Sequence, residues 1–264
     1  VELRVGAGRE VHAIPGTMNA IMGVNDRQQL ADLNQLIQRK RRSALMARGV
    51  TLVDPDTVYL NGRHLEIHPD TIIEPHVTLN GPISIEPNVR VGFGCHLTNV
   101  VIGEYSVIKP YTVAESATIG REAQIGPFSR LRPGTELSDK THVGNFCEIK
   151  NTSVAEGSKI NHLSYVGDAM IGRNVNIGAG TITCNYDGFG KYRTLIGEGA
   201  FIGSNASLVA PVSIGAGAII GAGSTITSDV DADSIAVERG ETRHKPGGAA
   251  RFRSHKTKAK QRGT

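Results

Sequence analysis

The 264-residue chain has few aromatic residues and few cysteines. It contains no tryptophan, six phenylalanines and three cysteines, and aromatic residues make up 5 % of the sequence. Three cysteines without a Cys-X-X-Cys pair argue against both a disulfide framework and a zinc ribbon. No apolar run approaches the ~18 residues of a membrane-spanning helix, and no stretch resembles a secretory signal. We therefore expect a cytoplasmic protein without a membrane partner, whose core is built from aliphatic side chains.

Positive charge is concentrated at the end of the chain. Residues 241–264 contain eight Lys and Arg residues and one acid, although the formal net charge of the whole chain is only +4. This segment has no apolar periodicity, which predicts a disordered basic tail. Because Phe252 is its one aromatic residue, the tail lacks the interleaved aromatics of many nucleic-acid-binding segments. We do not expect nucleic acid as a partner.

Aliphatic residues recur every six positions through the middle of the chain. Short runs in shifted registers contain 26 of them: Ile67, Ile73, Leu79, Ile85, Val91 and Leu97; Val101, Val107, Val113, Ile119, Ile125, Leu131, Leu137, Val143 and Ile149; Val154, Ile160 and Val166; Ile171 and Ile177; and Ile196, Ile202, Leu208, Ile214, Ile220 and Ile226. A period of six does not keep one helical face inward. It suits short strands that meet at corners, where glycine provides conformations that β-branched residues avoid.

Three six-residue sides close one coil, and coils of this kind stack on one another into a column. The repeats then make about eight or nine coils, and stacked strands ~4.8 Å apart give a column roughly 40 Å long. Each coil buries its aliphatic layer only when neighbouring coils cover it. The period therefore predicts an all-β fold, a hexapeptide parallel β-helix over residues 51–240.

Two segments depart from the six-residue period. Residues 26–47 carry Leu30, Leu33, Ile37 and Leu45 at helical spacing, which predicts an amphipathic linker helix within residues 25–50. Asn25 or Asp26 would be its N-cap, and Gly49 would end it. Residues 183–195 are polar, aromatic and rich in glycine, so we expect a loop extruded from one corner.

The core of such a column has no reactive groups, so candidate residues must lie on faces, loops or subunit boundaries. Among nine histidines, His64 and His68 lack a third ligand at a suitable spacing, which argues against zinc. His162 lies shortly before the loop, with Tyr165 three residues later, and is a candidate general base.

Arg132 and Lys150 are separated by exactly three of the six-residue repeats, so one coil would stack them on the same edge. Two stacked cations suit a phosphate group, although ordinary surface cations are the alternative. Gly215, Gly217 and Gly221 are corner glycines of the repeat rather than a nucleotide-binding loop, because no Gly-Lys-Ser/Thr follows them.

Several longer motifs resemble one enzyme family. They are MGVNDR at 22–27, RLRPG at 130–134, HVGNF at 142–146, HLSY at 162–165 with GDA at 167–169, NVNIGAGTITCNYDG at 174–188 and LVAPV at 208–212. Over roughly residues 20–240 the chain resembles the acetyltransferase part of the bifunctional bacterial N-acetylglucosamine-1-phosphate uridyltransferase / glucosamine-1-phosphate N-acetyltransferase family, which consists of hexapeptide-repeat acyltransferases.

The resemblance implies a left-handed β-helix, against the usual right-handed crossover preference, and a homotrimer with active sites between neighbouring columns. It implies acetyl transfer from acetyl-CoA to the 2-amino group of glucosamine-1-phosphate, for UDP-N-acetylglucosamine and cell-wall precursor synthesis. Carried over by motif, His162 would be the general base. The other implied positions are Arg132, Lys150 and Lys191 for the sugar phosphate, Tyr165 and Asn176 for the sugar, and Ala179, Asn185, Tyr186, Ser204, Ala222 and Arg239 for acetyl-CoA.

The chain also departs from the family, because the uridyltransferase half is missing. Residues 1–24 would be a remnant of that nucleotidyltransferase domain. Asn25 matches a Mg²⁺ ligand of that half, but its partner carboxylate is absent, so we expect no uridyl transfer by this chain. Two alternatives stay open: another hexapeptide acyltransferase acting on serine or a nucleotide-sugar amine, and a non-catalytic β-helical trimer that serves as a scaffold.

Overall fold

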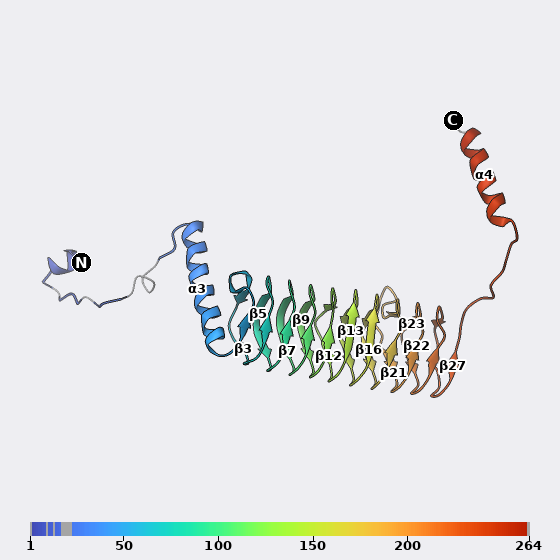
Figure 1. Cartoon of the computed structure of the whole chain (residues 1–264), viewed down its shortest axis with the longest axis horizontal. Coiled ribbons are helices and arrows are strands. Elements are labelled where there is room, and N and C mark those ends of the chain that lie inside the picture. The colour runs from blue at the N-terminus through green and yellow to red at the C-terminus, as the bar shows by residue number, and fades with distance from the viewer. Residues whose placement is uncertain (1, 9, 13, 17–22, 263–264) are drawn as a thin grey trace.

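The computed structural model describes residues 2–8, 10–12, 14–16 and 23–262, so the motif that starts at Met22 begins outside the described residues. A column of short parallel strands lies between helix α3 (Arg27–Ala47) and helix α4 (Gly248–Arg262), and a short helix α1 (Glu2–Val5) lies near the N-terminus (Figure 1). The expected left-handed parallel β-helix of hexapeptide repeats is confirmed.

One side of the column is an 11-stranded parallel sheet, here called sheet A. Its strands, in spatial order, are β1 (Thr51–Leu52), β4 (Ile72–Ile73), β6 (Arg90–Val91), β8 (Val107–Ile108), β10 (Gln124–Ile125), β13 (His142–Asn145), β16 (Lys159–His162), β19 (Asn176–Ile177), β22 (Phe201–Ile202), β25 (Ile219–Ile220) and β27 (Ile235–Ala236). This sheet makes the column longer than the expected eight or nine coils, because strands β1 and β27 add coils at its two ends.

The other two sides form one 16-stranded sheet, here called sheet B. Its first side contains β2 (Tyr59–Asn61), β11 (Arg130–Leu131), β14 (Glu148–Lys150), β17 (Tyr165–Gly167), β20 (Ile182–Cys184), β23 (Ser207–Val209) and β26 (Thr225–Ile226). Its second side contains β3 (Leu65–Ile67), β12 (Thr135–Leu137), β15 (Thr152–Val154), β18 (Ala169–Ile171), β21 (Thr194–Ile196) and β24 (Val212–Ile214). Strands β5 (Thr78–Ile85), β7 (His96–Ile102) and β9 (Val113–Ile119) bend across both sides, and a 3₁₀ turn covers Pro55–Thr57.

The aliphatic repeat fills the core, with one correction of register. The run from Ile67 to Leu97 is fully buried, and so is the run from Ile119 to Ile149. Between these runs, the prediction that Val101, Val107 and Val113 point inward is wrong. Ile102, Ile108 and Ala114 lie in the core instead, while Val101 is 47 % exposed.

Coil length explains the shift of register. Ala117 has a pairing partner in each neighbouring coil, Val100 in the coil before it and Thr135 in the coil after it. The earlier of these two coils is shorter by one residue. In the shorter coils five residues instead of six separate two inward positions at this corner, and Asn99, at φ +53°, lies there. Ile102 thus follows Leu97 after five residues and Ile119 follows Ala114 after five, so a mixture of coil lengths replaces the uniform coil.

Helix α3 begins and ends as predicted. The carboxylate of Asp26 accepts a hydrogen bond from the Gln29 amide at 2.7 Å, and Gly49 follows the helix at φ +92°. Only part of the expected apolar face packs on the column: Leu45 is buried there, whereas Leu30 and Ile37 are exposed, and the other buried residues are the polar Gln38 and Arg42.

Polar side chains make the junction between α3 and the first coil. The Gln38 amide donates to the carbonyl of Leu60 at 3.0 Å and accepts from the amide of the same residue at 2.8 Å. The side chain thus pairs with strand β2 as a neighbouring strand would, and it satisfies backbone groups at the end of the sheet.

The basic tail is the other correction. Residues 241–264 were expected to be disordered, but helix α4 covers Gly248–Arg262. Its sequence from 249 to 262 consists mainly of Ala, Lys, Arg, Gln and other residues compatible with a helix, without proline or glycine. Local propensity therefore favours a helix although no apolar stripe is present. None of the helices in the described part of the chain is long and apolar enough to cross a membrane.

Candidate functional site

Five predicted or newly recognised site residues lie on one corner of the column, between sheet A and the first side of sheet B. In successive coils this corner carries Asn145, His162, Ala179, Ser204 and Ala222. The carbonyl of each of the first four accepts a hydrogen bond from an amide at the same corner of the next coil, with N···O distances between 2.7 and 3.2 Å. We call this row the His162 corner. It joins the candidate base to three of the residues implied for acetyl-CoA.

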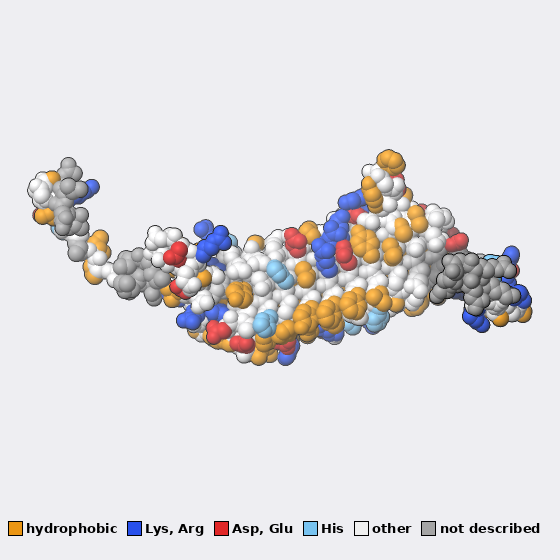
Figure 2. All heavy atoms as spheres, turned by 90° about the horizontal axis from the view of Figure 1, so that it is seen from above, with side chains coloured by type: hydrophobic (Ala, Val, Ile, Leu, Met, Phe, Trp, Pro, Cys, Tyr) orange, Lys and Arg blue, Asp and Glu red, His pale blue; other side chains and the backbone are white. Residues whose placement is uncertain are grey.

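The residue that follows each position of this corner changes in size along the column. Tyr111, Phe128, Phe146 and Leu163 form an exposed apolar ridge, in which ring centroids of successive aromatic residues are 5.0 and 5.5 Å apart. Figure 2 shows a band of hydrophobic side chains along one edge of the column. Beyond Leu163 the equivalent positions are Gly180, Asn205 and Gly223, all with positive φ. The ridge of large side chains therefore ends before the part of the corner that carries Ala179, Ser204 and Ala222.

His162 has a hydrogen-bond partner that fixes its tautomer. Its Nδ1 lies 3.2 Å from Oδ1 of Asn145. With the amide oxygen in this position, the contact is a hydrogen bond when Nδ1 carries the proton, and a neutral imidazole then has its lone pair on Nε2. The imidazole is exposed at the edge of a hollow that is also lined by Lys109, His142 and Asn161. Partial burial, followed by the charges of Lys109, Lys159 and His162, lowers the pKa of His142.

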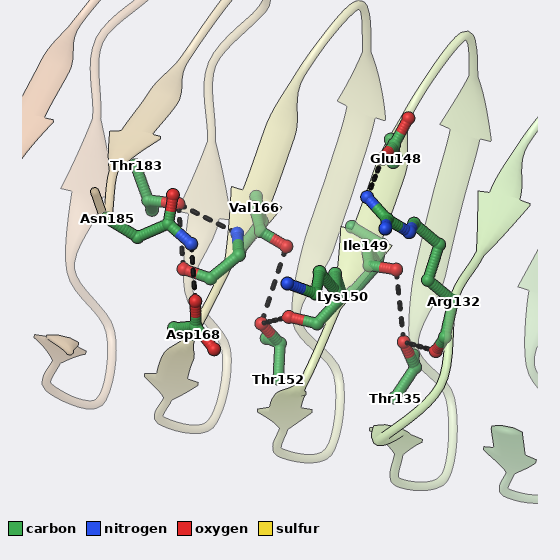
Figure 3. Close-up of polar contacts among 11 residues, drawn as sticks. Arg132, Thr135, Glu148, Ile149, Lys150, Thr152, Val166, Asp168, Thr183 and Asn185 are labelled. Atoms are coloured by element: carbon green, nitrogen blue, oxygen red, sulfur yellow. Dashed lines mark hydrogen bonds and ion pairs between the residues drawn. The ribbon is translucent and has the colours of Figure 1, made fainter. Parts of the chain in front are cut away.

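The predicted cation pair lies on the first side of sheet B. The amide of Arg132 donates to the carbonyl of Ile149 at 2.8 Å, so Arg132 and Lys150 occupy successive coils as the spacing predicted. Arg132 also forms an ion pair with Glu148 at 2.8 Å (Figure 3). The guanidinium of Arg132 is thus partly neutralised. The ammonium group of Lys150, in contrast, is directed toward the next coil of the column (Figure 3).

The Tyr165 side chain lies over Gly167 of its own strand β17, because glycine leaves room for it. A Cβ atom at Gly167 would lie 2.5 Å from the hydroxyl of Tyr165 and 3.0 Å from Nδ2 of Asn185. Only glycine allows the tyrosine hydroxyl and the Asn185 amide to approach each other here. The predicted sugar residue Tyr165 and the predicted acetyl-CoA residue Asn185 therefore lie together.

The predicted loop is an ordered hairpin, which we define as residues 185–193. The hairpin enlarges its coil, because Ala169 pairs with Thr194 across the whole insertion, whereas Ser153 pairs with Met170 in the preceding coil. Tyr186 and Lys191 form an antiparallel bridge. The carboxylate of Asp187 accepts hydrogen bonds from the amides of Phe189 and Gly190 at 2.8 and 2.7 Å, and these bonds lower its pKa.

Lys191 on this hairpin lies beside Lys150. The contact with the Lys150 side chain, and then the charge of that ammonium group, lowers the pKa of Lys191. The three cations predicted for a phosphate, Arg132, Lys150 and Lys191, therefore come from successive coils and the hairpin. In one chain they lie on sheet B and its hairpin, while His162 ends strand β16 of sheet A.

Two further predicted residues lie on sheet A and at the far end of the His162 corner. Asn176 is on sheet A, paired with Lys159 and Phe201. The guanidinium of Arg239 donates to the carbonyl of Ala222 at 2.9 Å, so it lies at the far end of the His162 corner.

Asn25 precedes helix α3, and its side chain donates to Gln29. In the ranges that the structure describes, no group of three His, Cys, Asp or Glu residues could hold a metal ion. A single amide oxygen beside a helix end does not by itself make a Mg²⁺ site.

Three contributors were missed in the sequence. Asn145 pairs with His162 in the next coil, which is one of the shorter coils, so the uniform six-residue period does not identify it as the neighbour of the imidazole. Gly167 and Asp168 stood within a recognised motif without an assigned role. Their importance depends on which residues of neighbouring coils lie side by side, and the six-residue period alone does not specify that pairing.

Comparisons with known proteins agree with the resemblance. The family model "Bacterial transferase hexapeptide (six repeats)" matches residues 193–228. The chain is 48 % identical to a "Bifunctional protein GlmU" of Methylococcus capsulatus over 90 % of its own length and 52 % of that protein. It is 51 % identical to the protein of the same name from Marinobacter nauticus, over 85 % of this chain and 49 % of the relative. The chain thus spans about half the length of these curated relatives.

Solved structures give a weaker match. The UDP-N-acetylglucosamine acyltransferase of Campylobacter jejuni is 17 % identical, with a TM-score of 0.38 over 61 % of this chain and 66 % of that one. The corresponding acyltransferase of Francisella novicida is 18 % identical, with a TM-score of 0.35 over 67 % and 66 %. Scores this low carry no argument about function. The curated relatives, by contrast, confirm the resemblance that the sequence motifs indicated.

Proposed function

We propose that this chain is the acetyltransferase part of a GlmU-type enzyme, transferring acetyl from acetyl-CoA to the 2-amino group of glucosamine-1-phosphate. The main support is the His162 corner. An exposed imidazole with an available Nε2 continues there into a row of small residues, Ala179, Ser204 and Ala222. An extended thioester can lie along such a row and present its acetyl group to the imidazole. The product would enter UDP-N-acetylglucosamine synthesis and so supply cell-wall precursors.

The proposed chemistry is general-base catalysis. An amine is largely protonated near neutral pH and cannot attack a thioester. Nε2 of His162 removes a proton, and the freed nitrogen lone pair attacks the acetyl carbonyl carbon. The tetrahedral oxyanion then collapses as the C–S bond breaks, the nitrogen gives up its second proton so that a neutral amide forms, and the departing CoA thiolate takes up a proton. Asn145 holds the ring with Nε2 directed outward throughout.

The three cations would bind the sugar phosphate. Lys150 stands next to Lys191 and lowers the pKa of Lys191, an effect that a bound phosphate dianion would reverse. Arg132 adds a planar donor but shares its charge with Glu148. Tyr165 and Asn176 are proposed to bind the sugar hydroxyls. Asn185, Tyr186 and Arg239 would join the three small corner residues in holding CoA.

We also propose a homotrimer with sites shared between copies. In one chain His162 lies on sheet A, whereas the cation pair lies on sheet B. An apolar ridge of four large exposed side chains runs along the same corner as His162, and exposed patches of this kind mark interaction surfaces. A second copy packed against the ridge would cover it and bring its own cations toward the imidazole. Because acetyl-CoA and sugar phosphates are cytoplasmic metabolites, the activity implies a cytoplasmic location.

A thiol-release assay separates this proposal from its alternatives. With acetyl-CoA we expect thiol release with glucosamine-1-phosphate but not with serine or a nucleotide-linked amino sugar. His162→Ala should lower the rate by ~10²–10⁴-fold, while His96→Ala, a substitution of a distant exposed histidine, should not. Release with serine or a nucleotide sugar would favour another hexapeptide acyltransferase. No release with any acceptor would favour a scaffold.

A further inference from the structure

Asp168 is a buried carboxylate at the corner where the two sides of sheet B meet. It is 6 % exposed and adopts a left-handed backbone conformation with φ +50°. Its Oδ1 accepts a hydrogen bond from the amide group of Asn151 in the preceding coil, and its Oδ2 accepts one from the amide group of Asn185 in the following coil. Figure 3 shows the side chains of Asp168 and Asn185 directed toward each other. One carboxylate thus connects three successive coils.

Both ends of the hairpin are attached to this one residue. Asn185 begins the hairpin and is held through its side chain. Thr194, which follows the hairpin, donates its amide to the carbonyl of Asp168 at 3.2 Å. Within the hairpin, the Tyr192 amide donates to the carbonyl of Asn185 at 3.0 Å. Asp168 therefore forms hydrogen bonds to both ends of the hairpin.

Asp168 also supplies negative charge next to the two lysines. Burial raises its pKa, but the hydrogen bonds from Asn151 and Asn185 and the charges of Lys150 and Lys191 outweigh burial, so its pKa lies below the ordinary value. The carboxylate is therefore ionised at neutral pH. Two ammonium groups side by side repel each other, and an adjacent anion reduces that repulsion.

We infer that Asp168 is a positioning residue for the phosphate site: it ties the hairpin to the column and thereby holds Lys191 beside Lys150 before substrate binds. The functional part of this inference rests on the proposed binding of a sugar phosphate by the two lysines. The structural part does not, because it concerns the order of the hairpin itself.

Two substitutions separate the tie from the charge. Asp168→Gly removes the carboxylate, and glycine tolerates the positive φ, so the backbone is not strained. Asp168→Asn is the matched control. Its amide oxygen can accept from Asn185, its amide group can donate to a flipped Asn151 side chain, and asparagine also tolerates positive φ. The control keeps the hydrogen bonds and loses the charge.

Hydrogen exchange of the full chain tests the tie without any substrate. In Asp168→Gly we expect the Tyr192 and Thr194 amides to exchange roughly 10- to 100-fold faster, the ratio that corresponds to one lost charge-assisted hydrogen bond. Amides of strand β10 should not change, and Asp168→Asn should stay within about threefold of the parent. If Asp168→Gly does not fold, Asn185→Ala removes the same tie from the other side. Unchanged hairpin exchange in the folded variant would overturn the inference.

Kinetics then tests the connection to Lys191. Asp168→Gly should raise the KM for glucosamine-1-phosphate about tenfold, but by less than about threefold in a Lys191→Met background, because coupled residues are not additive. Equal effects in both backgrounds would mean a general structural role and would overturn the positioning role. Faster hairpin exchange in a chain without acetyl transfer would refute the proposed function and leave the tie intact.

Discussion

The corrected register of the core can be tested at two adjacent residues. Ile102 is fully buried and stacks between Ile85 and Ile119 of neighbouring coils, whereas Val101 is 47 % exposed. Ile102→Ala removes buried carbon atoms and leaves a cavity between two packed layers, which costs about 2–5 kcal/mol. Val101→Ala removes two half-exposed methyl groups and should cost less than about 1 kcal/mol.

Urea unfolding monitored by circular dichroism measures this difference. Both variants and the parent are compared at one protein concentration, because association of copies changes apparent stability. We expect a large fall in midpoint for Ile102→Ala and a small one for Val101→Ala, with similar slopes. Equal losses, or a larger loss for Val101→Ala, would mean that the uniform six-residue register is right and that the shorter coil is wrong.

Three further predictions concern the site and the junction. In the thiol-release assay, Asn145→Ala should lower kcat about tenfold, because the imidazole loses the acceptor that orients it. The KM values for acetyl-CoA and for the sugar phosphate should change little, and a rise in KM alone would contradict this prediction. Because Lys150 lowers the pKa of Lys191, the KM for the sugar phosphate should begin to rise at a pH below the ordinary lysine pKa of 10.5. Lys150→Met should shift this rise in KM to higher pH. An unchanged pH profile would refute the coupling. Gln38→Ala should destabilise the chain by about 1–3 kcal/mol in urea, since it leaves the buried amide of Leu60 in β2 without its hydrogen-bond partner, whereas exposed Gln35→Ala should not. Equal midpoints for the two variants would exclude the proposed pairing.

Much of the fold could be predicted from the sequence because each coil repeats the same aliphatic position. Ile67 and Ile125 had to point inward for any layer to be buried. The register error at Val101 arose because a shorter and a longer coil differ by one residue at a single corner. The residue at that corner, Asn99 with its positive φ, does not reveal the coil length in the sequence. Helix α3 was misread in a related way, since Gln38 packs through hydrogen bonds that hydrophobic spacing does not reveal.

The site was predictable only in part. His162 and Lys150 are proposed from a motif and from spacing, both of which depend on the local sequence. The roles proposed for Asn145 and Asp168 involve neighbours in adjacent coils, so they depend on pairing across a shortened coil and across the coil that carries the hairpin. Such pairings follow from corner geometry and from the hairpin insertion, which three-dimensional packing determines.

The most direct test of the account is complementation between two inactive variants. His162→Ala and Lys150→Met are each purified, shown to be largely inactive, mixed, dissociated and reassociated. If each site takes its imidazole from one copy and its cations from the next, random mixing should restore about one quarter of the parent thiol-release rate. A mixture that exchanges copies but stays as inactive as its components would contradict a site shared between columns.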